Sequence, residues 1–522
     1  MHGFKVMRTC ALSLAALFAA YSFADAGILC KPRPLPGNVG NVAGLKLCIN
    51  NANKLAGGTI DLGGLLYVVT APDNTVDGPN GLPDITSNIV IRNGIIVRSS
   101  ATPFRLLHVS APGSLSLINL SMQSGSDTSG IGGGAIMMAA NAILGLIKDS
   151  HFTNNESNNV GGALYCAPNS VCNVITASAF SNNKAQTGGA IAVVGSSLSK
   201  VNEVLLSGNT ATTTSGGAIA ITDAGSITTI IASSFTNNQG ANYGGAIELE
   251  NGSSIDFIDS STFAFNNAIN GGAINVDLVA ASTIKKIYNS TFNDNTATIG
   301  GALKLNLGSI TSMANNTFNQ NVAIRQGGAI FIGASASISD LFNSTIDGNI
   351  AAAASGGGIY NCGTITGMIS TIAAENVGGL PGPANEDDVN NCGGTGSIGG
   401  TSSYNLIGSN ANNSFVDGAN HNKVGSPADP LDPDLGVLRD NGGRTFTMAL
   451  LTNSPAIGAG NNPLGLVHDQ RGRGFRRMVN GLTDIGAFEV QLQRECICPP
   501  HGDCRPGDCQ PVEFPSPRGR GK

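Results

Sequence analysis

The sequence predicts an all-β fold, a right-handed parallel β-helix of about a dozen coils, on the basis of three observations. The 522 residues include 71 glycines, yet only 12 % are charged and 5 % aromatic, which is typical of one repetitive architecture rather than of mixed α/β domains. A Gly-Gly-Ala-Ile motif or a close variant recurs every 27 to 29 residues. Each repeat also holds three short apolar segments separated by Gly, Asn and Ser, which indicates three strands per coil.

Two landmarks mark every repeat. The first glycine of the Gly-Gly motif stands at Gly133, Gly161, Gly188, Gly216, Gly244, Gly271, Gly300, Gly327 and Gly356. Before each copy from the second onward, an apolar residue is followed three positions later by Asn. These pairs are Phe152 and Asn155, Phe180 and Asn183, Leu206 and Asn209, Phe235 and Asn238, Phe263 and Asn266, Phe292 and Asn295, Phe318 and Asn321, and Ile346 and Asn349.

A repeat of this length predicts one coil, stacked on its neighbours at about the 4.8 Å spacing of adjacent strands. The alternative is a β-propeller, but its blades usually need about 40 residues. The preference of parallel strands for right-handed crossovers predicts the handedness.

Alternation within a strand predicts which side chains face inward. In the segment after Gly244, Ile247 and Leu249 point inward and Glu248 and Glu250 point outward. The phenylalanines of successive repeats then form an internal stack. We expect each repeated Asn to lie at a turn, where it tolerates a left-handed φ and can pass hydrogen bonds to its copy one coil away. The paired glycines allow the tight corner that leads into the next strand.

The chain divides by composition and period. The predicted parts are a signal peptide (1–26), an N-terminal cap with irregular first coils (27–132), regular repeats (133–375), irregular C-terminal coils with a closing section (376–490), and a Cys- and Pro-rich tail expected to be flexible (491–522).

The first 26 residues indicate export. Lys5 and Arg8 precede an apolar run at 10–23, and Ala24 and Ala26 occupy the positions that flank signal-peptidase cleavage. We therefore expect a secreted or cell-surface protein, with outer-membrane association as one option. No other apolar run is long enough for a transmembrane segment in the mature chain.

Ten cysteines remain after cleavage, an even number in an oxidising compartment. Local pairing in chain order is the simplest disulfide scheme, although connectivity does not follow from sequence. A zinc site with His501 is the alternative for the tail cysteines. The disulfide candidates are Cys30, Cys48, Cys166, Cys172, Cys362, Cys392, Cys496, Cys498, Cys504 and Cys509.

Charge argues against some partners. The net charge is −6, and only Arg325 lies between Arg105 and Arg439 among the arginines, so no nucleic-acid partner is expected. The histidines lack metal-ligand spacing, and neither a metal nor a cofactor is expected.

At these motifs the chain resembles known families. The Gly-Gly-Ala-Ile and Phe-x-x-Asn pairing resembles the repeats of the polymorphic outer-membrane proteins, surface-exposed autotransporter adhesins with a β-helical, pectin-lyase-like passenger. The stretches "NLIGSN", "DPDLGVLRDNGGRTFTMALLTNSPAIGAGN", "DQRGRGFRR" and "DIGAFE" are similar to the closing section of bacterial choice-of-anchor Q β-helix proteins. The first resemblance implies adhesion, and the second implies a block that precedes a surface-anchoring tail.

Two neighbouring rows of outward residues suggest chemistry. Glu250 and Asp277 are expected one strand spacing apart, and Lys304 is expected to balance Glu248. Paired carboxylates suit acid–base cleavage of glycosidic bonds. A solvated strip of compensating charges is the preferred interpretation, because no aromatic-walled cleft accompanies these residues. Glu248, Glu250, Asp277 and Lys304 are therefore candidates only, and no catalytic residue is assigned.

The arginines near residue 470 also have two interpretations. Arg471, Arg473, Arg476 and Arg477 either bind an anionic glycan or form ion pairs that fasten an irregular cap, and we prefer the ion pairs.

The leading function is adhesion to, or binding of, a host cell, matrix or glycan. A polysaccharide lyase or glycoside hydrolase on the same scaffold is the first alternative, since fold does not decide function. A structural surface or matrix protein is the second.

Overall fold

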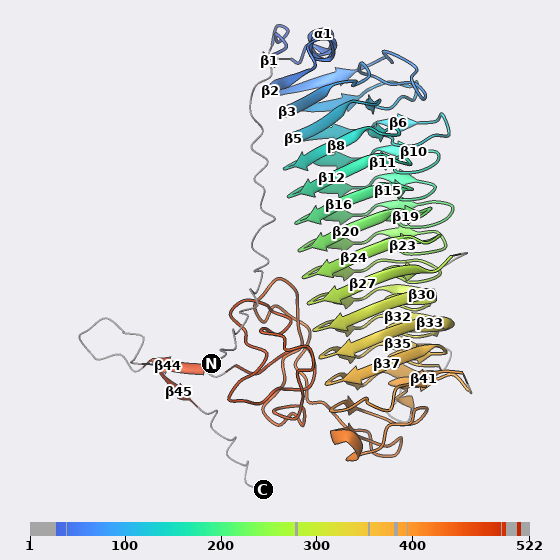
Figure 1. Ribbon diagram of the computed structural model, residues 1–522, viewed down its shortest axis with the longest axis vertical. Helices are drawn as coiled ribbons and strands as arrows, with labels where there is room; N and C mark the ends of the chain where they lie inside the picture. Colours follow the sequence, from blue (N-terminus) through green and yellow to red (C-terminus); the bar gives the residue numbers. More distant parts are fainter. Residues whose placement is uncertain are drawn as a thin grey trace, which may run out of the picture.

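A computed structural model describes residues 28–37, 39–276, 280–352, 355–379, 385–393 and 395–491, and the backbone of 493–496 and 509–512. The predicted signal peptide and most of the tail lie outside these residues. The chain forms an all-β solenoid of about 13 parallel turns stacked along one axis (Figure 1). The predicted β-helix is confirmed.

Three strands of each coil form three faces of the stack. Face A follows the Gly-Gly motifs and holds β4 (Leu107–Val109), β7 (Ile136–Met138), β11 (Leu164–Cys166), β15 (Ile191–Val194), β19 (Ile219–Thr222), β23 (Ile247–Leu249), β26 (Ile274–Val276), the first parts of β30 (Leu303–Ala314) and β33 (Ile330–Phe342), β36 (Ile359–Asn361) and β40 (Val389–Asn391). Face B holds β1 (Ile28–Cys30), β2 (Gly57–Val69), β3 (Asn88–Arg98), β5 (Ser114–Gln123), β8 (Ile143–Lys148), β12 (Val171–Thr176), β16 (Ser197–Asn202), β20 (Ser226–Ile231), β24 (Ser254–Asp259), β27 (Ser282–Tyr288), the later parts of β30 and β33, β37 (Thr364–Ile369) and β41 (Ser397–Ile398). Face C holds β9 (His151–Thr153), β13 (Ala179–Ser181), β17 (Leu205–Ser207), β21 (Ser234–Thr236), β25 (Thr262–Ala264), β28 (Thr291–Asn293), β31 (Thr317–Asn319), β34 (Thr345–Asp347), β38 (Ile372–Ala374), β42 (Leu406–Ile407) and β43 (Lys423–Val424).

Shorter elements complete the described chain. Two small parallel sheets lie before the Gly-Gly corners, and an antiparallel hairpin lies in the tail. The first small sheet consists of β6 (Ser126–Asp127), β10 (Glu156–Ser157), β14 (Lys184–Ala185), β18 (Thr210–Ala211) and β22 (Gln239–Gly240). The second consists of β29 (Thr296–Ile299), β32 (Val322–Gln326), β35 (Ile350–Ala351) and β39 (Val377–Gly378). The hairpin pairs β44 (Gln493–Cys496) with β45 (Cys509–Val512), and a 3-10 turn spans Ala419–His421.

Helix α1 (Val42–Lys54) covers the first coil, as Figure 1 shows at the blue end. The Asn41 side chain caps it by accepting a hydrogen bond from Gly44 N at 3.0 Å. Leu45 and Ile49 are fully buried on its inner face. The helix therefore shields the exposed strand edge at this end of the solenoid.

The Gly-Gly corner needs each glycine for a different reason. Gly244 has a φ of 52°, in the left-handed region that favours glycine. A Cβ on Gly245 would run into the carbonyl oxygen of Gly272 in the next coil. The first glycine thus permits the turn, and the second permits close stacking.

The repeated asparagines form the Asn ladder, which consists of Asn155, Asn183, Asn209, Asn238, Asn266, Asn295, Asn321, Asn349 and Asn376. All are at most 1 % exposed. In the first eight, the side-chain Nδ2 donates to Oδ1 of the Asn in the next coil at 2.8–3.0 Å. One expectation is corrected: the left-handed φ belongs to the residue before the ladder Asn, such as Asn237 with a φ of 55°, because that residue turns the chain while the ladder Asn points inward.

The predicted phenylalanine stack is confirmed. Neighbouring rings lie 4.6–4.8 Å apart between centroids and within 9° of parallel, in two runs separated by Leu206. Stacked rings and the Asn ladder thus fill the interior coil by coil.

Residues 431–491, the docked block, fold back beside the lower coils (Figure 1). They contact a threonine column on face C, where β28, β31 and β34 pair in register. Gln470 Nε2 donates to Thr291 Oγ1 at 2.8 Å, and Thr317 Oγ1 donates to Gln470 Oε1 at 2.6 Å. Ile372 and Leu406 of the solenoid pack with Ile485 of the docked block in a second small hydrophobic core.

Candidate functional site

The outward row after the Gly-Gly motifs is closed to solvent. Glu248 and Asn275 are 0 % exposed and Lys304 is 6 % exposed. They follow one another in register on face A, and Asn275 Nδ2 donates to Glu248 Oε1 at 3.0 Å. The structure therefore corrects the expectation of a solvated strip.

The preceding turn explains this burial. A Cβ on Gly244 would contact the backbone of Ile247 and Glu248, so the corner lies against the outer side of its own strand. The Tyr243 ring, from the same turn, lies 5.9 Å from Lys304 Nζ. The backbone of its own corner thus lies against Glu248, and a tyrosine from the same corner lies near Lys304 two coils further along.

The other two candidates have different outcomes. Glu250 is half-buried just beyond β23, and its carbonyl oxygen accepts a hydrogen bond from Ser253 Oγ at 2.6 Å. Asp277 lies outside the described residues, so the carboxylate pair with Glu250 remains a prediction. The structure brings together Glu248 and Lys304, with Asn275 between them, in a closed layer of the scaffold.

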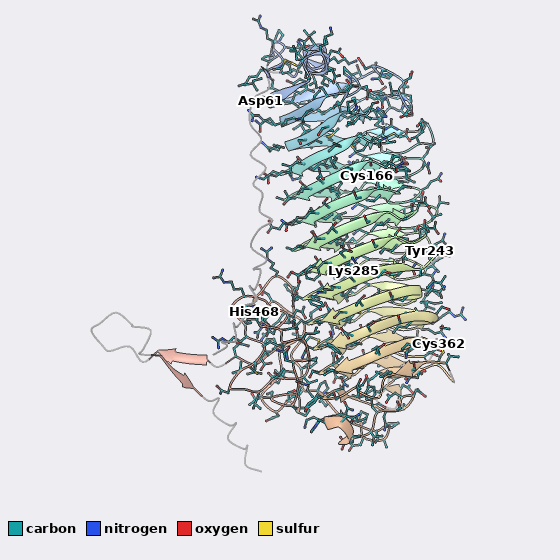
Figure 2. All side chains as sticks on the ribbon, in the orientation of Figure 1. Asp61, Cys166, Tyr243, Lys285, Cys362 and His468 are labelled. Carbon is teal, nitrogen blue, oxygen red and sulfur yellow. A yellow bond between two sulfur atoms is a disulfide. The ribbon has the colours of Figure 1, made fainter. Side chains whose placement is uncertain are left out.

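Three predicted disulfides are present, and they lie at different levels of the stack. Cys30–Cys48 ties β1 to α1, Cys166–Cys172 closes the turn between β11 and β12, and Cys362–Cys392 joins successive coils. Figure 2 shows Cys166 in the upper coils and Cys362 in the lower ones. Cys496 and Cys509 face each other in the backbone register of β44 and β45, while Cys498 and Cys504 lie outside the described residues.

The arginines of the docked block include buried ion pairs, as predicted. Arg471 Nη2 lies 2.6 Å from Asp469 Oδ2, and the Arg471 guanidinium lies 3.7 Å from the Phe488 ring centroid. Arg477 is fully buried and contacts Glu489 at 3.2 Å. Burial raises the pKa of Glu489 to about 8. These contacts fasten the block internally.

An open hollow of about 590 Å³ lies on face B near the N-terminal end. We call it the lateral groove, and its lining is Asn88, Ser114, Ser116, Ile118, Ile143, Gly145, Leu146, Lys148, Asn173 and Val174. Its wall is mostly apolar, and Ile143 is 38 % exposed. Such a surface suits a ligand that offers apolar area with a few polar groups.

A local irregularity creates this groove. The pairing of β5 with β8 shifts by one residue between Leu115 and Ser116, which leaves Gly145 as the extra residue. A Cβ on Gly145 would lie 2.7 Å from Ser116 Oγ. Gly145 therefore allows Ser116 to lie close to the backbone of β8 in the lining of the groove, and no periodic sequence signal marks this site.

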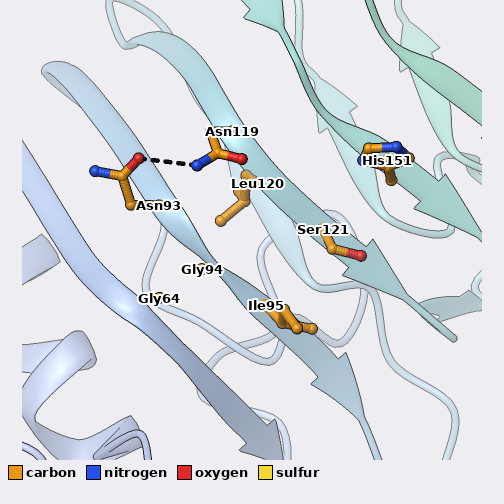
Figure 3. Close-up of a pocket in the computed structure, with 8 residues that line it drawn as sticks. All are labelled: Gly64, Asn93, Gly94, Ile95, Asn119, Leu120, Ser121 and His151. Atoms are coloured by element: carbon orange, nitrogen blue, oxygen red, sulfur yellow. Dashed lines mark hydrogen bonds between the residues drawn. The ribbon is translucent and has the colours of Figure 1, made fainter.

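A polar shelf of about 230 Å³ adjoins the groove across β3 and β5 (Figure 3). Asn119 Nδ2 donates to Asn93 Oδ1 at 3.2 Å, and Asn93 Nδ2 donates to Asp61 Oδ1 at 3.3 Å. His151 stands on the neighbouring strand β9 and is exposed. The shelf presents hydrogen-bonding groups close to the apolar groove.

Metal-binding clusters and membrane-spanning helices are both absent from the described part of the chain. Within the described ranges, no three His, Cys, Asp or Glu side chains are arranged to hold a metal ion. The same part of the chain contains no helix of sufficient length and apolarity to cross a membrane.

Comparison with known proteins gives one match. Residues 149–167 and 232–250 match the Chlamydia polymorphic membrane protein repeat. Both segments contain a stacked Phe, a ladder Asn and the Gly-Gly corner. No curated protein and no solved structure matches the chain. The two matched segments show that the chain carries repeats similar to those of the Chlamydia polymorphic membrane proteins.

Proposed function

We propose that this chain is an exported adhesion protein that binds a host-cell, matrix or glycan ligand through the lateral groove. The proposal rests on where the groove lies relative to the matched repeats. The first matched repeat, residues 149–167, begins directly after β8, and β8 lines the groove. A repeat similar to those of the Chlamydia polymorphic membrane proteins therefore lies beside an open hollow.

The burial of a candidate carboxylate favours binding over polysaccharide cleavage. Glu248 is closed in and accepts a hydrogen bond from a scaffold amide, whereas a glycosidase needs both carboxyl groups at the sugar. A panel of acidic and neutral polysaccharides tests this point. Cleavage that is lost in Glu250→Gln would establish the enzyme alternative instead.

The binding test uses the purified mature chain on host cells, matrix proteins and a glycan array. Val174→Asp places a charge in the groove, and Thr229→Asp is the matched control, two coils further along the same outward column. We expect the wild type and Thr229→Asp to bind, and Val174→Asp to lose at least about tenfold in affinity. Absence of binding to every surface would favour a purely structural role.

We also propose that residues 376–490 act as a choice-of-anchor Q closing section, with the tail as the anchoring signal. The docked block supports this, because hydrogen bonds between the Gln491 side chain and the Arg476 backbone hold the chain near the start of the predicted tail against the block. Fractionation of the full chain and a chain truncated after Gln491 provides the test. Release of only the truncated chain into the medium is expected, and identical behaviour would contradict an anchoring role.

A further inference from the structure

Five acidic residues meet where the last coils contact the docked block. We call this contact the acidic seam. Asp347 is on β34, Glu375 follows β38, Glu386 and Asp388 precede β40, and Asp432 is the second residue of the docked block. Asp387 also faces this region, but its carboxylate accepts hydrogen bonds from Gly356 N, Asn390 Nδ2 and Asn412 Nδ2.

Asp388 ends the Asn ladder. Its Oδ1 accepts hydrogen bonds from Asn376 N at 3.0 Å and from Asn376 Nδ2 at 2.9 Å, as a ladder Asn would. Its Oδ2 accepts from Ser409 N at 2.7 Å. The polar column that runs through the core therefore terminates on a fully buried carboxyl group.

Two carboxyl oxygens in the seam lack a hydrogen-bond partner. Asp347 is 3 % exposed, and its Oδ1 has none. Buried Oε2 of Glu386 has none either. A Cβ on Gly408 would lie 2.9 Å from that oxygen and 2.7 Å from Asp388 Oδ2, so these two carboxyl groups converge.

The docked block closes this space from the other side. Leu431 N donates to Gly408 O at 2.9 Å, which brings Asp432 to the rim of the seam. Buried acceptors without donors are costly when ionised, whereas a protonated carboxyl group supplies its own donor. The arrangement is thus suited to holding protons.

The electrostatic environment of the seam also favours protonated carboxyl groups. Burial raises the pKa of Asp388 to about 8 and, with the charges of Glu375 and Asp432, that of Glu386 to about 7. Burial and the neighbouring carboxyl groups also raise the pKa of Asp347 well above its ordinary value. Burial and the charge of Asp432 also raise the pKa of Glu375.

We propose that the acidic seam is a proton-dependent latch, which holds the docked block on the last coils in mildly acidic solution and loosens as the solution becomes alkaline. This inference is independent of the proposed binding function. Protons bridge or neutralise the converging carboxyl groups when the seam is closed. Loss of those protons leaves like charges in a closed, poorly solvated contact.

The direction follows from linkage. The closed-state pKa values are raised, so the closed seam binds more protons than the open one. The stabilisation is complete below the ordinary carboxyl pKa and is lost as pH rises through the closed-state values of about 7 and about 8. Each proton released on opening multiplies the opening constant by about ten per pH unit within that window.

Hydrogen exchange of the full chain tests the latch. Protection factors, corrected for intrinsic exchange rates, are compared between about pH 5 and about pH 8 for peptides from 372–391 and 431–435, with 209–250 as the internal reference. We expect the seam peptides to lose at least about tenfold in protection relative to the reference. Equal protection at both pH values would overturn the proposal.

Two neutral variants separate proton binding from a merely structural role. Asp347→Asn and Glu386→Gln are expected to retain seam protection at about pH 8, and Asp256→Asn on β24 is the matched control with an unchanged profile. Lower protection at every pH in both seam variants would contradict the latch. Protection at about pH 8 that depends on added Ca²⁺ and is reversed by a chelator would also contradict the latch, since a cation would then occupy the seam.

Discussion

Replacement of a single ladder residue, Asn238→Ala, is expected to destabilise the solenoid strongly. Asn238 Oδ1 accepts hydrogen bonds from both Asn209 N and Asn209 Nδ2 at 3.0 Å, and its Nδ2 donates to Leu206 O and Asn266 Oδ1. The alanine variant therefore leaves two donors of Asn209 buried without a partner. At about 1–3 kcal/mol for each, the free energy of unfolding falls by about 2–6 kcal/mol.

Urea unfolding combined with hydrogen exchange measures this loss, because a solenoid need not unfold as one unit. Protection is expected to fall first in the coils around residues 206–266. Asn237→Gly is the matched control: Asn237 is adjacent, exposed and already in the left-handed region, so its change is expected within about 1 kcal/mol. Wild-type stability and protection in Asn238→Ala would refute the reasoning that the ladder satisfies buried groups.

Three further predictions concern the scaffold. Phe263→Ala removes a ring that stacks on both neighbours and is expected to lower the free energy of unfolding by about 3–5 kcal/mol in a denaturant titration, so a loss below about 1 kcal/mol would contradict tight stacking. Gly245→Ala drives a Cβ into the next coil and is expected to reduce soluble yield and melting temperature, whereas Gly252→Ala, at an open turn, is expected to change melting much less. Replacement of Cys166 and Cys172 by Ser opens a loop with a sequence separation of only 6 and is expected to cost about 2–3 kcal/mol in the same titration; an unchanged midpoint would show that this bond adds no stability.

The interior was predictable from the sequence because each coil repeats the same requirements. Phe263 and Asn266 must meet their copies one coil away, so the period alone indicates their positions. The Gly-Gly corner follows from an equally local constraint, whereas the structure was needed to establish the disulfide partners of Cys30, Cys166 and Cys362.

The surface was less predictable because a side chain that points away from the core can still be buried. Alternation correctly turns Glu248 away from the core, but it carries no information about the corner that covers the strand. The groove depends on one register shift at Gly145, and the acidic seam depends on Asp432 meeting Asp347 from far along the chain. Such features arise from departures from the repeat.

The distance between spin labels on face B tests the stacked-coil architecture most directly. Lys200, Thr229, Phe257, Lys286, Ser312 and Asp340 are consecutive register partners. Labels at Lys200 and Asp340 are five coils apart and are predicted to lie about 24 Å from each other, while labels at Thr229 and Asp340 are predicted to lie about 19 Å apart. Distances that follow this step of about 4.8 Å per coil would support the solenoid, and distances unrelated to the number of intervening coils would contradict it.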